Sequence, residues 1–219
     1  MTNIQALLFI SRKYHIIILI GDKMFKDHAM LMHELREYAS PKAKITRLIK
    51  SGEIIQVRRG IFLPAADRVY SLKSLAAIVY GPSYISFESA LSYYGLIPEK
   101  VNAITSATFK KNKNRIFHTP LGDFYYYYLP AAAYPYSVKC EQEGGANFLI
   151  ASPEKALCDL LFRAGRVGSC EALRKLLHED WRIEPGSLET LDFAAFEFLA
   201  PLYRKTVFKH LLRLLKKEA

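Results

Sequence analysis

The sequence predicts an α+β protein in which an N-terminal winged helix-turn-helix precedes a larger α+β domain. A basic helix followed directly by a tight β-hairpin lies near the N-terminus. The middle of the chain has two helices, then several short strands, then a further helix, and the tail has apolar residues at helical spacing. Because the strands follow one another along the chain, we expect a small, mostly antiparallel sheet and a helical C-terminal tail.

The basic helix is predicted over residues 40–52. Ser40 is a good N-cap, and Pro41 at the first helical position loses no hydrogen bond. Ile45 and Ile49 fall on one face at helical spacing. Gly52, which readily takes the left-handed conformation, is typical of a helix end.

The hairpin follows at once. Residues 53–57 form an apolar strand, Arg-Arg-Gly at 58–60 forms a turn, and residues 61–63 form a second strand that ends at Pro64. A helix and hairpin in this order predict a recognition helix for the major groove and a wing for the backbone or minor groove.

The charge of this segment favours nucleic acid as its ligand. Residues 40–60 carry six basic side chains and one acid, a net charge of +5. The alternative is a solvated amphipathic helix and hairpin that bind nothing, or that contact protein. Arg47 is the candidate for reading guanine, and Thr46 for contact with a thymine methyl group. The candidate DNA-binding residues are Lys42, Lys44, Thr46, Arg47, Lys50, Arg58 and Arg59.

Composition narrows the class of protein. The 219 residues suit one or two domains, and 51% are hydrophobic, which is enough for a packed core. The net charge of +10 favours phosphate-rich partners, nucleic acid first and an anionic membrane second. No apolar run reaches the roughly 18–20 residues that a bilayer-spanning helix needs. Cys140, Cys158 and Cys170 have no CxxC spacing, so we expect reduced thiols in a cytoplasmic protein.

Residues 1–23 have two interpretations. They form a helix or strand that packs onto the DNA-binding unit, or they precede the natural start at Met24; we slightly prefer the second. His28 and His33 are five residues apart and do not share a helix face, so we expect surface histidines and no metal site.

Further elements follow a short linker at residues 65–68. A polar loop is expected at 141–145. We expect helices at 27–38, 69–80, 85–95 (with Ser86 as N-cap), 154–164, 171–178, 188–199 and 203–217, and strands at 103–109, 116–118, 124–129 and 148–150. The last helix has a basic face. Three interpretations of this face remain open: a solvated surface, a second phosphate contact or a site for an acidic partner.

Catalytic motifs are missing from the sequence. There is no GxxxxGK[ST], HExxH, GxSxG or GxGxxG. Asp123, Glu141 and Glu143 with Lys139 faintly suggest the carboxylates and lysine of a metal-dependent nuclease, but their spacing forms no known site. The tyrosine run at 125–128 either stacks on bases or packs in the core, and we favour the core. We therefore expect no enzyme activity, no cofactor and no metal.

Three stretches together resemble the AbiEi-like antitoxins, the transcriptional regulators of type IV toxin–antitoxin systems in abortive infection. They are ITRLIKSGEIIQVRRGIFLP at 45–64, YISFESALSYYGLIPE at 84–99 and IASPEKALCDLL at 150–161. The resemblance covers roughly residues 25–165; the segment before Met24 and the tail fall outside it.

The resemblance implies a phage-defence autorepressor. A winged helix at 24–66 would bind operator repeats in double-stranded DNA, and the domain at 67–219 would counteract a nucleotidyltransferase-like toxin without binding it tightly. The seven candidate residues above would contact DNA, and the family has no catalytic residues to carry over. The alternatives are a nuclease-like enzyme that a winged helix targets to nucleic acid, and a protein-interaction module that uses the C-terminal helix.

Overall fold

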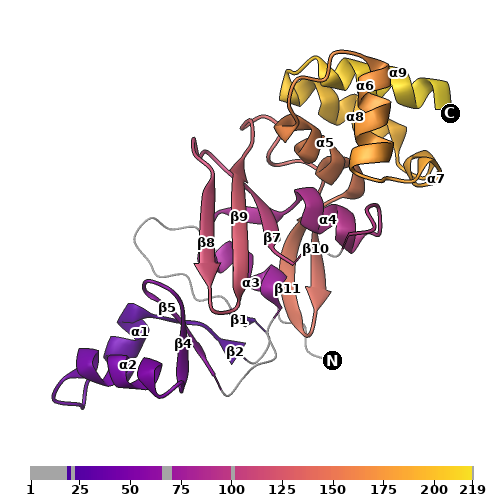
Figure 1. Ribbon diagram of the computed structural model, residues 1–219. Helices are drawn as coiled ribbons and strands as arrows, with labels where there is room; N and C mark the ends of the chain where they lie inside the picture. Colours follow the sequence, from indigo (N-terminus) through magenta and orange to yellow (C-terminus); the bar gives the residue numbers. More distant parts are fainter. Residues whose placement is uncertain (1–18, 21–22, 66–70, 100–101, 219) are drawn as a thin grey trace, which may run out of the picture.

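The computed structural model describes residues 19–20, 23–65, 71–99 and 102–218, and it has an α+β fold (Figure 1). Most of the expected linker and most of the N-terminal extension lie outside the described residues. Within that extension, β1 (Leu19–Ile20) pairs with β2 (Lys23–Met24) in an antiparallel ribbon. No helix in the described ranges combines the length and apolar character that crossing a bilayer would require.

The N-terminal unit contains two helices and a three-stranded sheet. The strand order is β3-β5-β4, so the first strand pairs with the second strand of the hairpin. Leu31, Ile45 and Phe62 form a small core between the helices and the sheet. The elements are β3 (Lys26–Asp27), α1 (His28–Glu34), α2 (Pro41–Lys50), β4 (Ile54–Arg58) and β5 (Ile61–Pro64).

The other face of this sheet packs against the rest of the protein. Phe25, Val57 and Leu63 belong to the large core, whereas Phe62, the neighbour of Leu63, belongs to the small one. This division follows from strand geometry, because successive side chains point to opposite faces. The sheet therefore carries α1 and α2 on one side and joins the larger domain on the other.

The larger domain is built on a six-stranded sheet of order β10-β11-β6-β7-β9-β8. Three of its five strand pairings are antiparallel, in line with the prediction of a mostly antiparallel sheet. The expected meander order is wrong, because β11 pairs with β6 and β7 pairs with β9 in parallel. The expected polar loop at 141–145 is largely strand, and β6 was not predicted. The strands are β6 (Ser83–Ile85), β7 (Ile104–Thr108), β8 (Arg115–Thr119), β9 (Gly122–Tyr128), β10 (Val138–Glu143) and β11 (Ala146–Ala151).

Helices lie on both faces of this sheet. Tyr126 of β9 donates its hydroxyl to the Ala76 carbonyl of α3 (Leu72–Val79) at 2.7 Å. The next side chain, Tyr127, packs edge-on against Phe87 of α4 (Phe87–Tyr93) at 5.2 Å. The tyrosine run is therefore packed mainly between the sheet and its helices, as the sequence indicated.

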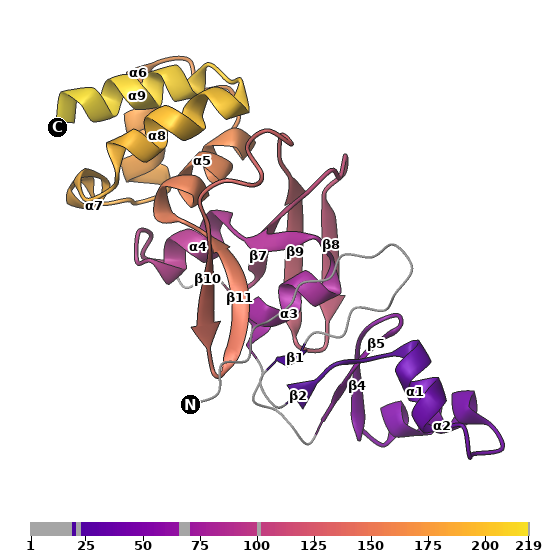
Figure 2. The same ribbon diagram turned by 180° about the vertical axis from the view of Figure 1, so that it is seen from behind.

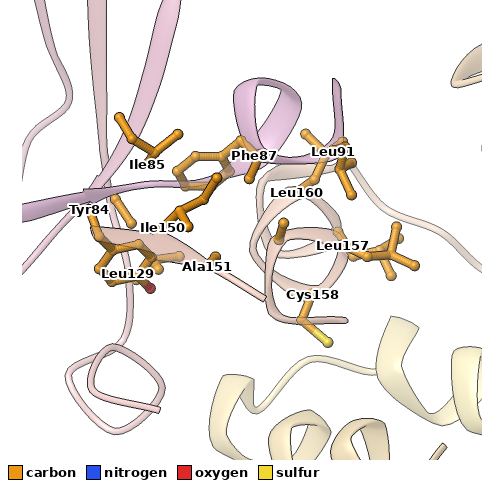
Figure 3. Packing of buried hydrophobic residues seen from close by; sticks show 14 of the residues in the cluster. Tyr84, Ile85, Phe87, Leu91, Leu129, Ile150, Ala151, Leu157, Cys158 and Leu160 are labelled. Carbon is orange, nitrogen blue, oxygen red and sulfur yellow. The ribbon is translucent and has the colours of Figure 1, made fainter. Parts of the chain in front are cut away.

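A helix continues the core beyond the end of the sheet. α5 (Pro153–Arg163) presents Leu157, Cys158 and Leu160 to a cluster that includes Phe87 of α4 and Ile150 of β11 (Figure 3). Pro153 at the first helical position and Ser152, which accepts a hydrogen bond from the Lys155 N–H, start this helix. Its apolar side therefore links the sheet to the tail.

The tail folds as a group of helices at the opposite end of the sheet from α1 and α2 (Figures 1 and 2). The helix expected at 188–199 is two helices, with a break at residues 190–192, and the last helix begins at Val207 instead of Tyr203. The elements are α6 (Cys170–Lys175), a π-helical turn (Leu176–Asp180), α7 (Pro185–Glu189), α8 (Phe193–Leu199), a 3₁₀ turn (Ala200–Tyr203) and α9 (Val207–Glu218).

Candidate nucleic-acid interface

Local signals fix the ends of α2. Pro41 occupies the start, as predicted, but the Ser40 side chain makes no capping bond; only its carbonyl accepts the Lys44 N–H at 3.0 Å. At the other end Gly52 has φ +75°, and the Glu53 N–H donates to the Leu48 carbonyl at 3.0 Å. The left-handed glycine turns the chain directly into β4.

The two sides of α2 face different environments. Ile45 is 5% exposed and packs in the small core with Leu31 and Phe62. The opposite side faces solvent, because the apolar spacing leaves the polar positions outward. Its exposed members are Lys42, Thr46, Arg47 and Lys50.

Two candidate residues make contacts within the unit. The Thr46 hydroxyl donates to the Lys42 carbonyl at 3.1 Å, so its methyl group remains available for other contacts. Lys44 is half-buried, and its Nζ lies 5.3 Å from the centre of the Tyr38 ring. Lys44 therefore lies beside the turn between α1 and α2.

The two arginines of the hairpin are placed differently. Arg59 is exposed at the turn, next to Gly60 with φ +83°. Arg58 is half-buried, and its guanidinium lies 5.9 Å from the ring of Phe117 in β8, with its Nε buried. The sequence placed both arginines on the wing, whereas Arg58 lies at the junction with the larger domain. The β4–β5 register shifts between Gln56 and Arg58, so strict strand alternation is interrupted and Arg58 can face the same side as Val57.

Four cations of the interface have no acidic partner within the described part of the chain. Lys42, Arg47, Lys50 and Arg59 form no ion pair with any residue that the structure describes. Such side chains can bind phosphate without first breaking an internal salt bridge, and an arginine can also bind guanine through two hydrogen bonds.

A second polar cluster is completely buried. The Nζ of Lys155 lies 2.5 Å from Oδ1 of Asp159 and 2.6 Å from the Tyr203 hydroxyl, and both charged side chains are 0% exposed. Burial raises the pKa of Tyr203 and of Tyr84 well above the usual tyrosine value, and the Asp159 charge adds to both shifts. Neither tyrosine ionises at neutral pH, so both act as donors to the carboxylate.

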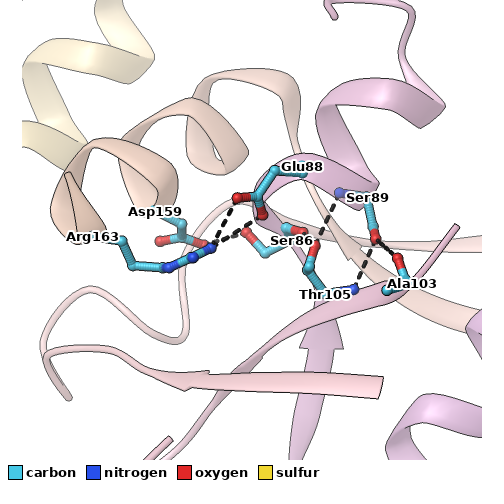
Figure 4. A network of polar contacts seen from close by, with 7 residues as sticks. All are labelled: Ser86, Glu88, Ser89, Ala103, Thr105, Asp159 and Arg163. Carbon is cyan, nitrogen blue, oxygen red and sulfur yellow. Dashed lines mark hydrogen bonds and ion pairs between the residues drawn. The ribbon is translucent and has the colours of Figure 1, made fainter. Parts of the chain in front are cut away.

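The serines near the start of α4 complete this cluster (Figure 4). Ser86 Oγ donates to Asp159 Oδ2 at 2.6 Å instead of capping α4. The Ser89 N–H donates to Thr105 Oγ1 at 2.9 Å, and the Thr105 N–H donates back to Ser89 Oγ at 2.8 Å. Arg163 pairs with Glu88 at 3.1 Å beside them. These contacts tie α4, α5 and β7 together and leave the serine hydroxyls engaged.

The carboxylates considered for a nuclease are not brought together. Asp123 lies on β9 and contacts His118 at 2.8 Å, near one edge of the sheet. Glu141 and Glu143 lie on β10 at the other edge. Glu143 bonds to Lys73 and Ser71, both at 2.7 Å. The described part of the chain contains no group of three His, Cys, Asp or Glu side chains that could hold a metal.

A scan against known protein families found no match, and a comparison with curated proteins also found none.

Proposed function

We propose that the chain is a DNA-binding autorepressor and antitoxin of the AbiEi type, acting in abortive infection. One observation carries the proposal: the cationic side of α2 is exposed, while its apolar side is buried beside a β-hairpin. A recognition helix must have this division to reach base edges in the major groove.

The topology of the N-terminal unit supports the same proposal. A strand, two helices and a hairpin, with the first strand paired to the last, are typical of a winged helix-turn-helix. Arg59 at the hairpin turn takes the role of the wing's phosphate contact, and Arg58 holds the wing against the larger domain. The proposed DNA contacts are Lys42, Lys44, Thr46, Arg47, Lys50 and Arg59.

We further propose that the larger domain provides antitoxicity in the cytoplasm without catalysis and without tight binding to the toxin. The resemblance of residues 84–99 and 150–161 to the AbiEi-like family motivates this assignment. In the fold, these stretches supply Ser86, Lys155 and Asp159 of the buried cluster. A structural role therefore accounts for these three residues in the two stretches.

Two experiments test the proposal. Footprinting on the DNA upstream of the protein's own gene should reveal a protected repeat, and the protein should repress a reporter driven by that DNA. Co-expression should also relieve the toxicity of a nucleotidyltransferase-like protein encoded beside it. A failure to bind that DNA would exclude autorepression, and persistent toxicity would exclude the antitoxin role.

A further inference from the structure

Two cationic segments lie in the larger domain, away from α2. Residues 109–117 contain four lysines and arginines and no acid, and residues 200–217 contain six and no acid. Together they carry as many positive charges as the net charge of the whole chain, +10. The excess charge of the protein is therefore concentrated in a few places, and two of these lie outside the N-terminal unit.

Tyr128 and Phe162, which lie outside both segments, connect them through a chain of contacts. The Tyr128 N–H donates to Asn114 Oδ1 at 3.3 Å, and the Tyr128 ring lies edge-on to the Phe162 ring at 6.3 Å. Lys205 Nζ donates to the Phe162 carbonyl at 2.5 Å and lies 4.7 Å from the centre of its ring. The β7–β8 loop and the residues that lead into α9 thus lie at one end of the sheet, opposite the end that holds α2 (Figures 1 and 2).

Two cations of α9 point into solvent. Phe208 and Leu211 are buried, whereas Lys209 and Arg213, one turn apart, are exposed. Neither cation forms an ion pair with a described residue, in contrast to Lys216, which lies 3.3 Å from Glu197. This side of the helix therefore offers unpaired positive charge.

An exposed aromatic ring lies between the two segments. Tyr128 is 43% exposed at the end of β9. Arg115 pairs with Tyr126 in the sheet register, so Arg115 and Tyr128 point to the same face. Cations beside an exposed ring are the combination that binds an unpaired strand, because the ring stacks on a base while the cations hold phosphates. A duplex buries its base faces by stacking and cannot use such a ring.

We propose that Lys113, Arg115, Tyr128, Lys205, Lys209 and Arg213 form a second site, the distal cationic surface, which binds single-stranded nucleic acid. The site is independent of the proposed recognition of duplex DNA by α2.

Fluorescence anisotropy with labelled oligomers of about 12 nucleotides tests the proposal. The probes are oligouridylate, oligothymidylate, a random duplex of the same length and polyglutamate. The wild-type protein should bind both single strands, and the ratio of the two affinities identifies RNA or DNA as the preferred form. Tyr128→Ala should weaken this binding roughly tenfold, because it removes one stacking platform, while Tyr128→Phe should retain it.

Charge variants separate this site from α2. Lys209→Gln with Arg213→Gln should flatten the slope of log affinity against log salt by about 1.4, since each phosphate contact on a single strand contributes about 0.7. Arg47→Ala in α2 and Lys139→Gln on β10 should leave single-strand binding unchanged, even if α2 proves not to bind DNA. Circular dichroism checks that each variant is folded.

Equal effects of Tyr128→Ala and Tyr128→Phe, or a loss with Arg47→Ala equal to that of the double variant, would overturn the proposal. Binding of polyglutamate as tight as that of the oligomers, insensitive to Tyr128→Ala, would also overturn it and assign the surface to an acidic protein.

Discussion

Lys155 and Asp159 form a salt bridge of 2.5 Å in which neither side chain is exposed to solvent. They are four residues apart on α5, and the Tyr203 hydroxyl donates to the same carboxylate oxygen at 2.5 Å. Tyr84 and Ser86 donate to the other oxygen. A single carboxylate thus connects the sheet, the start of α4 and the C-terminal helices.

Removing one charge of this pair should destabilise the fold strongly. Lys155→Met leaves the Asp159 charge buried without its counterion, and we expect the free energy of unfolding to fall by about 3–5 kcal/mol. Urea denaturation measures the loss. The double variant Lys155→Met/Asp159→Asn should lose less than the single variant, and Lys139→Met at an exposed site should change little. A double variant as unstable as Lys155→Met would contradict this account.

The two arginines of the hairpin should have separable effects. Arg58→Ala removes the contact with Phe117, so it should lower stability by about 0.5–1 kcal/mol and change DNA affinity little. Arg59→Ala should weaken DNA binding and leave the unfolding midpoint unchanged, because its side chain is exposed. Urea denaturation and anisotropy on the same two variants compare these effects. Reversed effects would place Arg58 on the DNA.

Glu143 should contribute a pH-dependent stability. The hydrogen bond from Lys73 lowers its pKa below the ordinary value of 4.5, and Ser71 adds to the shift. Because the folded pKa is lower than the unfolded one, the stabilisation is present above pH 4.5 and is lost as the pH falls through the folded pKa. Glu143→Gln should therefore lower the urea midpoint at pH 7 and have a shrinking effect under acid conditions. Glu189→Gln, at an exposed position, is the control; an effect of Glu143→Gln that grew in acid would refute the linkage.

The three thiols should differ in reactivity. Burial raises the pKa of Cys158 far above the usual thiol value, and the Asp159 charge adds to this shift, so almost no thiolate forms. Cys140 is exposed on β10. Titration with a chromogenic disulfide should show a fast phase that Cys140→Ser removes, whereas Cys158 should react only in denaturant. Rapid labelling of Cys158 in the native protein would show that the α5 core opens readily.

Sequence periodicity predicted much of the architecture and missed particular pairings. α2 and β5 were located to within about two residues, because Pro41, Gly52 and the hairpin turn are strong local signals. The parallel pairings of β6 with β11 and of β7 with β9 were missed, since the register between distant strands depends on tertiary packing. The order of the strands along the chain predicts only a meander.

Side-chain partners across the fold were equally hard to predict. Lys155 and Asp159 are one turn apart on α5, but only the fold brings Tyr203, 48 positions from Lys155 along the chain, to the same ammonium. Likewise, Arg58 and Arg59 are equivalent in sequence and differ only because Phe117 of β8 lies beside one of them. The exposed candidates on α2 needed no long-range information, since helical spacing sets their face.

Anisotropy with the duplex upstream of the protein's own gene, compared with a random duplex, tests the central claim most directly. Arg47→Ala should cost about 1–3 kcal/mol on the upstream duplex and much less on the random one. Lys50→Ala should weaken both duplexes alike and reduce the salt slope by about 0.9, and Lys139→Ala should change neither. Unchanged binding of both duplexes by Arg47→Ala and Lys50→Ala would contradict the claim that the exposed side of α2 binds DNA.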